Sequence, residues 1–201
     1  MLYTIFDLET TGFNGTSDAV CQFAFITVNQ NLLPVRARNY YFYKEGMPWS
    51  EQAAAVHGLT RSFLKQYEDA YEQNLIHMYT ALQRGNLVGH NSNGFDIPFA
   101  NQFLMREGFP PIVPGVCYDT MLLWHRTFGK RMKLANLPAA LGIPESQIIQ
   151  LAQNAGDLRS HNACYDVAAT TYCLREAVKK GLCSLKPVSA QEQRAQVSLS
   201  I

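Results

Sequence analysis

Two acidic residues stand two positions apart near the start of the chain, in the stretch YTIFDLETTGF at residues 3–13. This apolar stretch predicts a strand, in which side chains at positions i and i+2 point to the same face of the sheet. Asp7 and Glu9 should therefore direct two carboxylates at one spot. The first strand of a mixed α/β sheet is usually central, and unpaired buried carboxylates are costly. A divalent cation would stabilise both, because Mg²⁺ and Mn²⁺ prefer carboxylate and water oxygens.

Two later segments supply further acids. Asp96 lies in GHNSNGFDIPF, beyond a predicted strand end, and His161 and Asp166 lie in SHNACYDVAAT, at the start of the last predicted helix. Each residue also has a purely structural interpretation. Asp96 could be an acid favoured by a helix dipole, His161 a solvated histidine and Asp166 a surface acid. Taken together with Asp7 and Glu9, four acids from three segments could hold two cations ~3.5–4 Å apart. Such a pair is used for in-line displacement at phosphorus.

These side chains need a scaffold of strands and helices. Enrichment in β-branched and aromatic residues predicts strands over residues 2–8, 19–28 and 38–44, with turn chemistry between them, and a short buried strand in NLVGHNS. Periodicity and helix-end signals predict helices over residues 49–55, 70–84, 96–108, 118–128, 133–141 and 162–180. Strands first, then strand and helices in alternation, indicate a mixed α/β sheet with helices on its faces. We expect one domain over residues 1–183 and a flexible polar tail over 184–201.

Composition limits the class of protein. The 201 residues suit one domain, and 47% apolar with 16% charged residues indicates a folded globular chain. A net charge of +1 argues against a protein that coats long nucleic acid, but not against one that grips a few nucleotides. Five cysteines without a CxxC pair argue against a disulfide framework or a zinc site. With neither a signal peptide nor a membrane-spanning run, we expect a soluble, cytoplasmic protein with no membrane contact.

The segments FDLETTG, NSNGFD and HNACYD, in that order, resemble the three motifs of the DEDDh (DnaQ-like) 3′–5′ exonucleases. VHGLT at 56–60, DT at 119–120 and LANLPAALGI at 134–143 resemble further segments of that family, so the resemblance covers about residues 1–180. It implies an RNase H-like fold, with a mixed five-stranded sheet flanked by helices. It also implies a metal-dependent exonuclease that releases nucleoside 5′-monophosphates from the 3′ ends of single-stranded or frayed DNA, in proofreading, repair or end trimming.

The resemblance also assigns catalytic roles. It implies that two Mg²⁺ or Mn²⁺ ions are bound by four carboxylates: Asp7, Glu9, Asp96 and Asp166. It implies that His161 is the general base that takes a proton from the attacking water. On a continuous helix His161 and Asp166 would fall on different faces, so His161 is expected on the loop before the helix, with Asn162 or Ser160 as the cap. An ordinary histidine pKa near ~6.5 would make activity rise through that pH region.

Substrate contacts are a further implication of the resemblance. Groups of Thr10, Thr11 and Gly12 would hold the terminal nucleotide, and His57 would lie near its sugar or base. Phe95, beside the second motif, could wedge against the last base, a contact that contributes ~1–3 kcal/mol in single-strand binding. The structural alternatives are that Phe95 belongs to the core and that His57 only caps a turn.

The last six residues, QVSLSI, resemble the short peptide with which bacterial DNA polymerases and proofreading subunits bind the sliding clamp. Gln196, Leu199 and Ile201 would be its anchors, since spaced apolar side chains on a free tail can be recognised by a few pockets. A DNA polymerase is a second expected partner. Short patterns of this kind also arise by chance in polar tails.

Three other hypotheses compete with a DNA exonuclease. The same chemistry could trim RNA ends or degrade short oligoribonucleotides, because nothing in the sequence reports on the 2′-hydroxyl. A binding module without catalysis would keep the fold, but all five catalytic positions are intact here. An RNase H-like endonuclease shares the carboxylates, although the segment with His161 and Asp166 argues against it.

Overall fold

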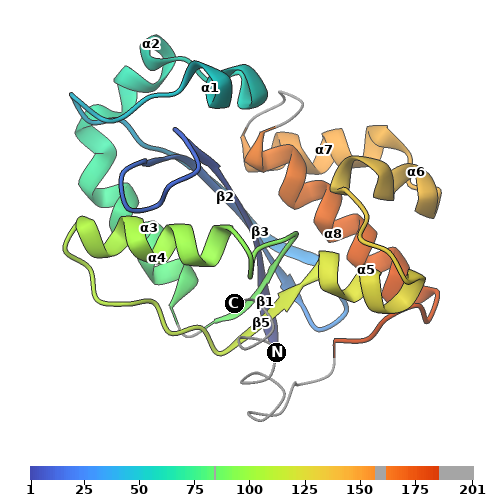
Figure 1. The fold of residues 1–201 in the computed structure, drawn as a ribbon. Coiled ribbons are helices and arrows are strands. Elements are labelled where there is room, and N and C mark those ends of the chain that lie inside the picture. Colours follow the sequence, from blue (N-terminus) through green and yellow to red (C-terminus); the bar gives the residue numbers. More distant parts are fainter. Residues whose placement is uncertain (84, 157–161, 186–201) are drawn as a thin grey trace.

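The computed structural model describes residues 1–83, 85–156 and 162–185. Its five strands form one sheet in the order β3–β2–β1–β4–β5 (Figure 1). The strands are β1 (Leu2–Thr10), β2 (Val20–Asn29), β3 (Pro34–Tyr41), β4 (Asn86–Gly89) and β5 (Val116–Asp119). β1, β2 and β3 pair antiparallel, whereas β4 runs parallel to β1 and to β5. The first strand is therefore central, and the predicted mixed five-stranded sheet is confirmed.

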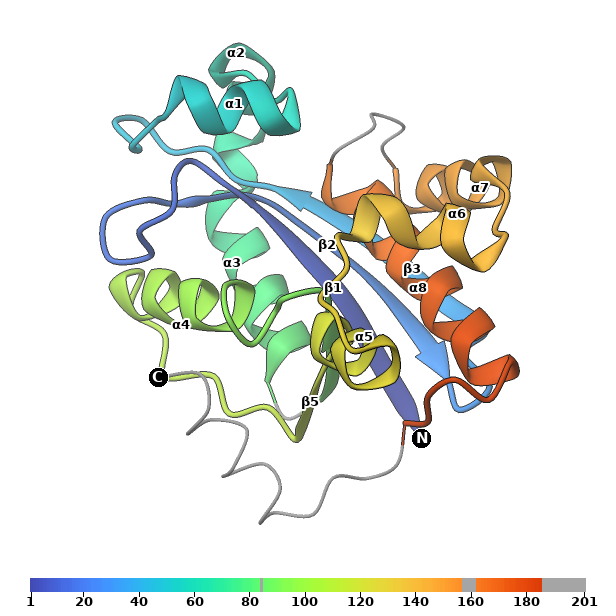
Figure 2. The same ribbon diagram turned by 45° about the vertical axis from the view of Figure 1, so that its right-hand side comes forward.

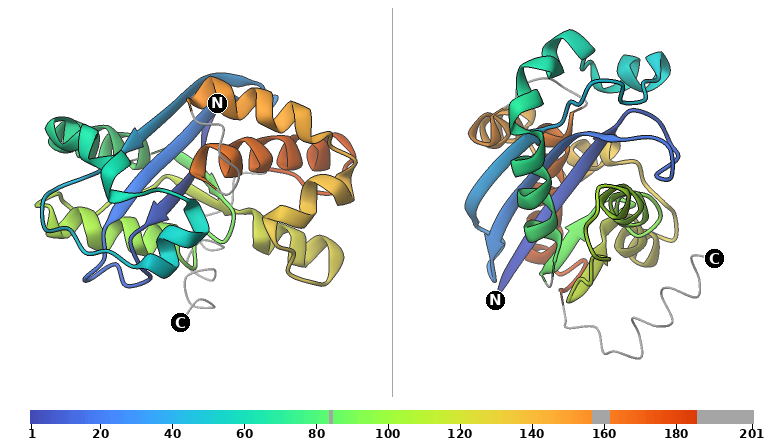
Figure 3. Two further views of the ribbon diagram at one scale, coloured as in Figure 1. Left: turned by 90° about the horizontal axis from the view of Figure 1, so that it is seen from above. Right: turned by 90° about the vertical axis from the view of Figure 1, so that its left-hand side faces the viewer.

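Helices cover both faces of the sheet (Figures 2 and 3). One face packs against α3 (Tyr71–Leu82) and α4 (Asp96–Arg106), and the other against α7 (Glu145–Ala155) and α8 (Ala163–Lys179). The remaining helices are α1 (Glu51–His57) and α2 (Arg61–Leu64), near the end of the sheet where β1 ends, and α5 (Thr120–Phe128) and α6 (Leu137–Leu141), which pack on α8. Two 3₁₀ turns, η1 (Lys65–Ala70) and η2 (Leu134–Asn136), precede α3 and α6.

Alternation along β1 connects the two cores to the acidic pair. Phe6 and Leu8 are buried in the cluster beneath α3 and α4, while Tyr3 and Ile5 are buried in the cluster beneath α8. Because the side-chain period of a strand is two, Asp7 and Glu9 continue the row of Tyr3 and Ile5. The pattern that buries apolar side chains beneath α8 thus aims two carboxylates towards that helix.

Several boundaries differ from the sequence predictions. β3 begins at Pro34 rather than at residue 38, which an edge strand permits because its first residue need not donate to the ladder. The helix predicted over 118–128 begins only at Thr120, because residues 116–119 form strand β5. Helix α7 and the turn of α2 were not predicted at all. Within the part of the chain that the structure describes, no helix is both long and apolar enough to cross a membrane.

Candidate active site

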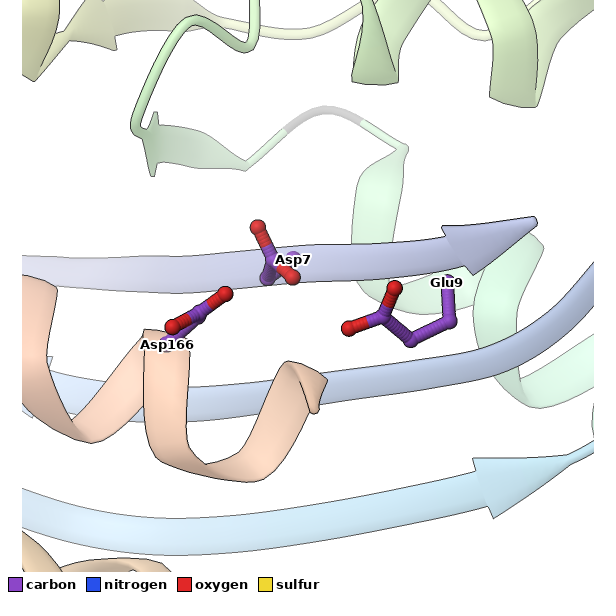
Figure 4. Close-up of side chains that lie close together, drawn as sticks. All are labelled: Asp7, Glu9 and Asp166. Atoms are coloured by element: carbon purple, nitrogen blue, oxygen red, sulfur yellow. The ribbon is translucent and has the colours of Figure 1, made fainter. Parts of the chain in front are cut away.

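Three carboxylates meet where β1 passes beneath the first turn of α8. One carboxylate oxygen from each of Asp7, Glu9 and Asp166 lies within 4.8 Å of the other two. Figure 4 shows Asp7 and Glu9 leaving the same strand and Asp166 facing them from the helix. The predicted convergence of the first and third motifs is therefore present in the structure.

Crowding of like charges perturbs these acids. Burial, followed by the charges of Asp96, Asp166 and Glu9, raises the pKa of Asp7 well above its ordinary value. Burial and the charges of Asp166 and Asp96 raise the pKa of Glu9 in the same way. Each carboxylate therefore makes ionisation of its neighbours less favourable, as expected where acids share a site. The cluster would be stabilised in its ionised form by added positive charge.

Asp96 approaches the cluster from the other layer of helices. It is the first residue of α4 and is only 5% exposed. Burial raises its pKa to about 7, although hydrogen bonds with the backbone of Leu8 and its own backbone act in the opposite direction. Asp96 lies outside the 4.8 Å set, yet its charge is the largest electrostatic cause of the raised pKa of Asp7. The predicted fourth carboxylate therefore belongs to the same electrostatic cluster.

A buried aspartate holds the β4–α4 loop, which precedes Asp96, through hydrogen bonds. Asp119 lies at the end of β5, is 5% exposed, and accepts hydrogen bonds from the backbone N–H groups of Asn91 (3.0 Å) and Asn93 (3.1 Å). It also caps α5 through the N–H of Met121 at 2.9 Å. Asn91 has a left-handed backbone with φ of 64°, which is uncommon for a non-glycine residue. The Asp119 side chain thus connects the β4–α4 loop to the start of α5.

Helix α8 begins where the sequence predicted it would. Asn162 is its N-cap, with its side-chain oxygen accepting from the N–H groups of Cys164 (2.9 Å) and Tyr165 (3.3 Å). Since the helix starts at Ala163, Asp166 is in its first turn and His161 precedes it. His161 itself lies outside the described residues, so its role as general base stays a prediction. The tail anchors Gln196, Leu199 and Ile201 also lie outside the described residues.

The predicted nucleotide-binding residues form hydrogen bonds within the β1–β2 connection, whose loop comprises residues 11–19. Thr10 Oγ1 donates to the carbonyl of Gly12 at 2.6 Å, and Thr11 Oγ1 accepts from the N–H of Ala19 at 2.9 Å. A Cβ at Gly12 would collide with the carboxylate of Asp18, so a larger residue there would displace that side chain. These residues have structural partners, and their contact with a nucleotide stays a prediction.

Phe95, the residue before Asp96, forms an aromatic pair with Phe13. Phe95 is half-buried and packs against Phe99 at 5.5 Å between ring centroids, and the Phe13 ring meets it edge-on at 6.4 Å. Phe13 is 77% exposed, which is unusual for so large an apolar side chain. Sequence reasoning selected Phe95 but missed Phe13. The available signal was its position directly after the first motif.

His57 is almost entirely buried. It is 2% exposed, and its Nδ1 accepts a hydrogen bond from the N–H of Leu59 at 3.0 Å, at the end of α1. Its Nε2 lies 3.8 Å from Cys21 Sγ, and burial, followed by the charge of Glu9, raises the pKa of that thiol. His57 therefore has the turn-capping role proposed as its structural alternative, and it lies one side chain away from the acidic cluster.

Comparison with known proteins reveals the relationship of the chain. The family RNase_T, an exonuclease family, matches residues 4–174, which include all three acidic segments. The chain belongs to this exonuclease family. The predicted resemblance to DnaQ-like DEDDh 3′–5′ exonucleases is therefore confirmed, and the chain is an enzyme domain of that type.

Relatives of this exonuclease domain differ in size and name. A PolC-type DNA polymerase III of Mycoplasma pneumoniae is 31% identical over 170 residues, 83% of this chain but 11% of the polymerase. A ribonuclease T of Yersinia pseudotuberculosis is 26% identical over 192 residues, 88% of this chain and 84% of the ribonuclease. The zinc-bound complex of E. coli exonuclease I with single-stranded DNA has a TM-score of 0.70 at 17% identity, covering 89% of this chain and 41% of that one. The chain thus spans a small part of the polymerase and under half of exonuclease I, whose likeness confirms the fold.

The exonuclease family is dependent on divalent metal ions, and the residues of this domain fit such an ion. The cluster of Asp7, Glu9 and Asp166 offers carboxylate oxygens only, the ligand type that hard divalent cations prefer. Burial and mutual repulsion raise the pKa values of Asp7 and Glu9, a strain that a bound cation would relieve. The domain is therefore suited to a divalent metal at this point.

Proposed function

We propose that this domain removes nucleoside 5′-monophosphates from the 3′ ends of single-stranded or frayed DNA, in proofreading, repair or end trimming. The observation that carries the proposal is the convergence of acids from three distant segments on one point, in a chain of the exonuclease family. The PolC-type relative is named as a DNA polymerase, and exonuclease I has been solved with single-stranded DNA, which supports DNA as the substrate.

The four carboxylates would hold two Mg²⁺ or Mn²⁺ ions. Bound together, the ions would lower the pKa of a water and stabilise charge on the phosphoryl oxygens during in-line displacement. The chain supplies the geometry: β1 holds Asp7 and Glu9, α4 holds Asp96, and α8 holds Asp166. His161, which precedes α8 in the sequence, would take the proton from the attacking water as general base.

The terminal nucleotide would lie against the Phe13–Phe95 pair. An exposed aromatic ring beside a half-buried one offers a base an apolar face, and such stacking tolerates any base. A paired 3′ end would have to unpair before its last base could reach the rings. Single-stranded and mismatched ends should therefore be cleaved faster than paired ends.

A time course on 5′-labelled single-stranded DNA tests the proposal. With Mg²⁺ or Mn²⁺ the label should run as a ladder that shortens from the 3′ end, and both EDTA and Asp7→Ala should abolish the ladder. Absence of shortening by the metal-loaded wild-type domain on any single strand would contradict the proposal.

An exoribonuclease is the second candidate. The similarity to ribonuclease T extends over 88% of this chain and 84% of that protein, so a relative of comparable length carries an RNA-directed name. An RNA oligonucleotide of the same sequence, run beside the DNA, separates the candidates. A faster RNA ladder would replace DNA with RNA as the proposed substrate.

We further propose a sliding clamp as a partner, through Gln196, Leu199 and Ile201, and a DNA polymerase as a second partner, in the cytoplasm. The QVSLSI pattern supports the clamp, and the PolC-type relative supports the polymerase. Deletion of residues 196–201 should leave cleavage of free oligonucleotides intact and abolish binding to a bacterial clamp. Equal clamp binding by the shortened chain would rule the tail out.

A further inference from the structure

Arg106 ties the β1–β2 loop to the end of helix α4. It is the last residue of α4, and its two guanidinium nitrogens donate to two backbone carbonyls of the loop. Nη1 bonds the carbonyl of Gly15 at 2.9 Å and Nη2 bonds that of Asp18 at 2.5 Å. Figures 1 and 2 both show this loop lying over α4. The helix and the loop are therefore joined by a forked, charge-assisted contact.

The loop that Arg106 holds is braced internally. The carboxylate of Asp18 accepts from the N–H of Asn14 at 2.8 Å, and the Asn14 side chain accepts from the N–H of Thr16 at 3.0 Å. At Gly15 the loop backbone lies so close to the helix that an added Cβ would be 3.1 Å from Phe99 Cα. A displacement of the carbonyl ends held by Arg106 would therefore move the loop as a unit.

That unit carries Phe13, and the helix that anchors it carries the opposing ring. Phe95 immediately precedes α4, so the position of Phe95 is set by the start of the helix and that of Phe13 by the contacts near its end. The two rings meet at 6.4 Å, with Asp96 directly after Phe95. α4 thus links a carboxylate of the acidic cluster, one ring and the anchor of the other ring.

We propose that Arg106 is a positioning residue that sets Phe13 against Phe95 and thereby fixes the subsite for the substrate's terminal base. This inference rests on the proposed nuclease function. Arginine suits the task because its planar fork can hold two carbonyls in a fixed relation, whereas a lysine ammonium is a flexible point charge. Arg106 contacts neither the acids nor, in this proposal, the substrate; it acts through Phe13.

The test compares Arg106→Met with Phe13→Ala, the double variant and a matched control. The control is Lys44→Met, which removes a cation that pairs with Glu107, at 3.0 Å, at the same end of α4 rather than with the loop carbonyls. For each variant we would measure kcat and KM on 5′-labelled single-stranded DNA, oligonucleotide Kd in EDTA by fluorescence anisotropy, Tm, and the rise in Tm with Mn²⁺.

Arg106→Met and Phe13→Ala should each raise KM and Kd by about tenfold, in the range that loss of one base–aromatic stack gives. Their kcat and their Mn²⁺-induced rise in Tm should stay near the wild-type values. The double variant should bind no more weakly than Phe13→Ala, because coupled residues are not additive. Arg106→Lys should recover part of the loss, and Lys44→Met should bind as wild type.

If the increases in Kd of the two single variants multiply in the double variant, the positioning role is overturned. An equal increase in Kd in Lys44→Met, or a fall in kcat instead of a rise in KM in Arg106→Met, would overturn it too. An unchanged Kd and KM in Arg106→Met beside a weakened Phe13→Ala would overturn the inference about Arg106 alone. Wild-type protein that binds neither DNA nor RNA and cleaves neither with Mn²⁺ would instead overturn the proposed function.

Discussion

At the scale of single residues, the acids that make the site useful make the metal-free fold less stable. Burial and mutual repulsion raise the pKa values of Asp7 and Glu9, and burial raises that of Asp96 to about 7. An unfolded aspartate titrates near ~3.9, so between about pH 4 and pH 7 the folded state binds more protons than the unfolded state. By linkage, the stability of the metal-free protein falls as pH rises through that window.

The first prediction concerns the sign of this pH dependence. In EDTA, Tm should be highest near pH 5 and should fall towards pH 8, whereas saturating Mn²⁺ should restore Tm at pH 8, because the cation binds the deprotonated acids. Thermal melts at matched ionic strength measure both effects. A metal-free Tm that rises from pH 5 to pH 8 would contradict the raised pKa values.

The second prediction separates stability from function at one residue. Asp96→Asn keeps an oxygen that can accept the backbone hydrogen bonds but removes a buried charge. In EDTA at pH 8 it should stabilise the fold by on the order of 2 kcal/mol, or about 5 °C in Tm. The same substitution should abolish cleavage. Lower stability of the variant than of the wild type under these conditions would show that the charge is already balanced within the protein.

Residue types revealed part of this site before the structure did. Asp7 and Glu9 followed from strand periodicity alone, because two acids on one face of a central strand need a counter-charge. Asp96 and Asp166 were candidates because four acids from three segments could hold two cations, and the motif resemblance then assigned them as metal ligands. Phe13 was missed because its exposure depends on how the loop folds back on α4, a tertiary property that a sequence pattern does not contain.

At the scale of elements, Asp119 joins two segments that a sheet brings together. Its carboxylate accepts N–H groups from the β4–α4 loop and from the start of α5. These bonds hold the loop that leads directly into Phe95 and Asp96 at the start of α4. Errors of about 1 Å in such positions can cost about 10²-fold in rate.

The third prediction tests that role. Asp119→Asn replaces the oxygen that accepts from Asn93 with a donor, so the loop must shift and kcat should fall by about 10- to 100-fold. Ser50→Ala is a matched control, because it removes another helix N-cap, at α1, and should lower the free energy of unfolding by about 1 kcal/mol. Its kcat should be that of the wild type. An Asp119→Asn variant with unchanged kcat would show that the loop keeps its conformation without the second acceptor.

Elements with a strong pattern or a clear end signal were predictable, whereas α7, α2 and β5 were not. β1, β2, α4 and α8 have strong patterns or caps, and Asn162 was identified in advance as one of two candidate caps. β5 has only four residues and is contiguous with α5, so its last two residues were assigned to the predicted helix over 118–128 and its first two to no element. Short strands obtain their stability from sheet neighbours and tertiary packing, which local propensity does not report.

At the scale of the whole molecule, the proposed reaction requires a chain end. The fourth prediction is that a circular single-stranded DNA stays intact under conditions in which the linear form of the same sequence is degraded. Phe95, which immediately precedes Asp96, belongs to an aromatic pair suited to a terminal base, and a continuous strand offers no such end. Gel electrophoresis of both forms measures the difference. Nicking of the circle would indicate an endonuclease.

The placement of the four acids has a consequence for assembly. Asp96 enters from the helix layer on one face of the sheet and Asp166 from the layer on the other, with Asp7 and Glu9 on the strand between them. The four acids therefore come together only when both helix layers pack against the sheet. If the chain were divided into two fragments between α4 and β5, Asp166 would lie on one fragment and the other three acids on the other. Nuclease activity of the mixed fragments would then measure their association.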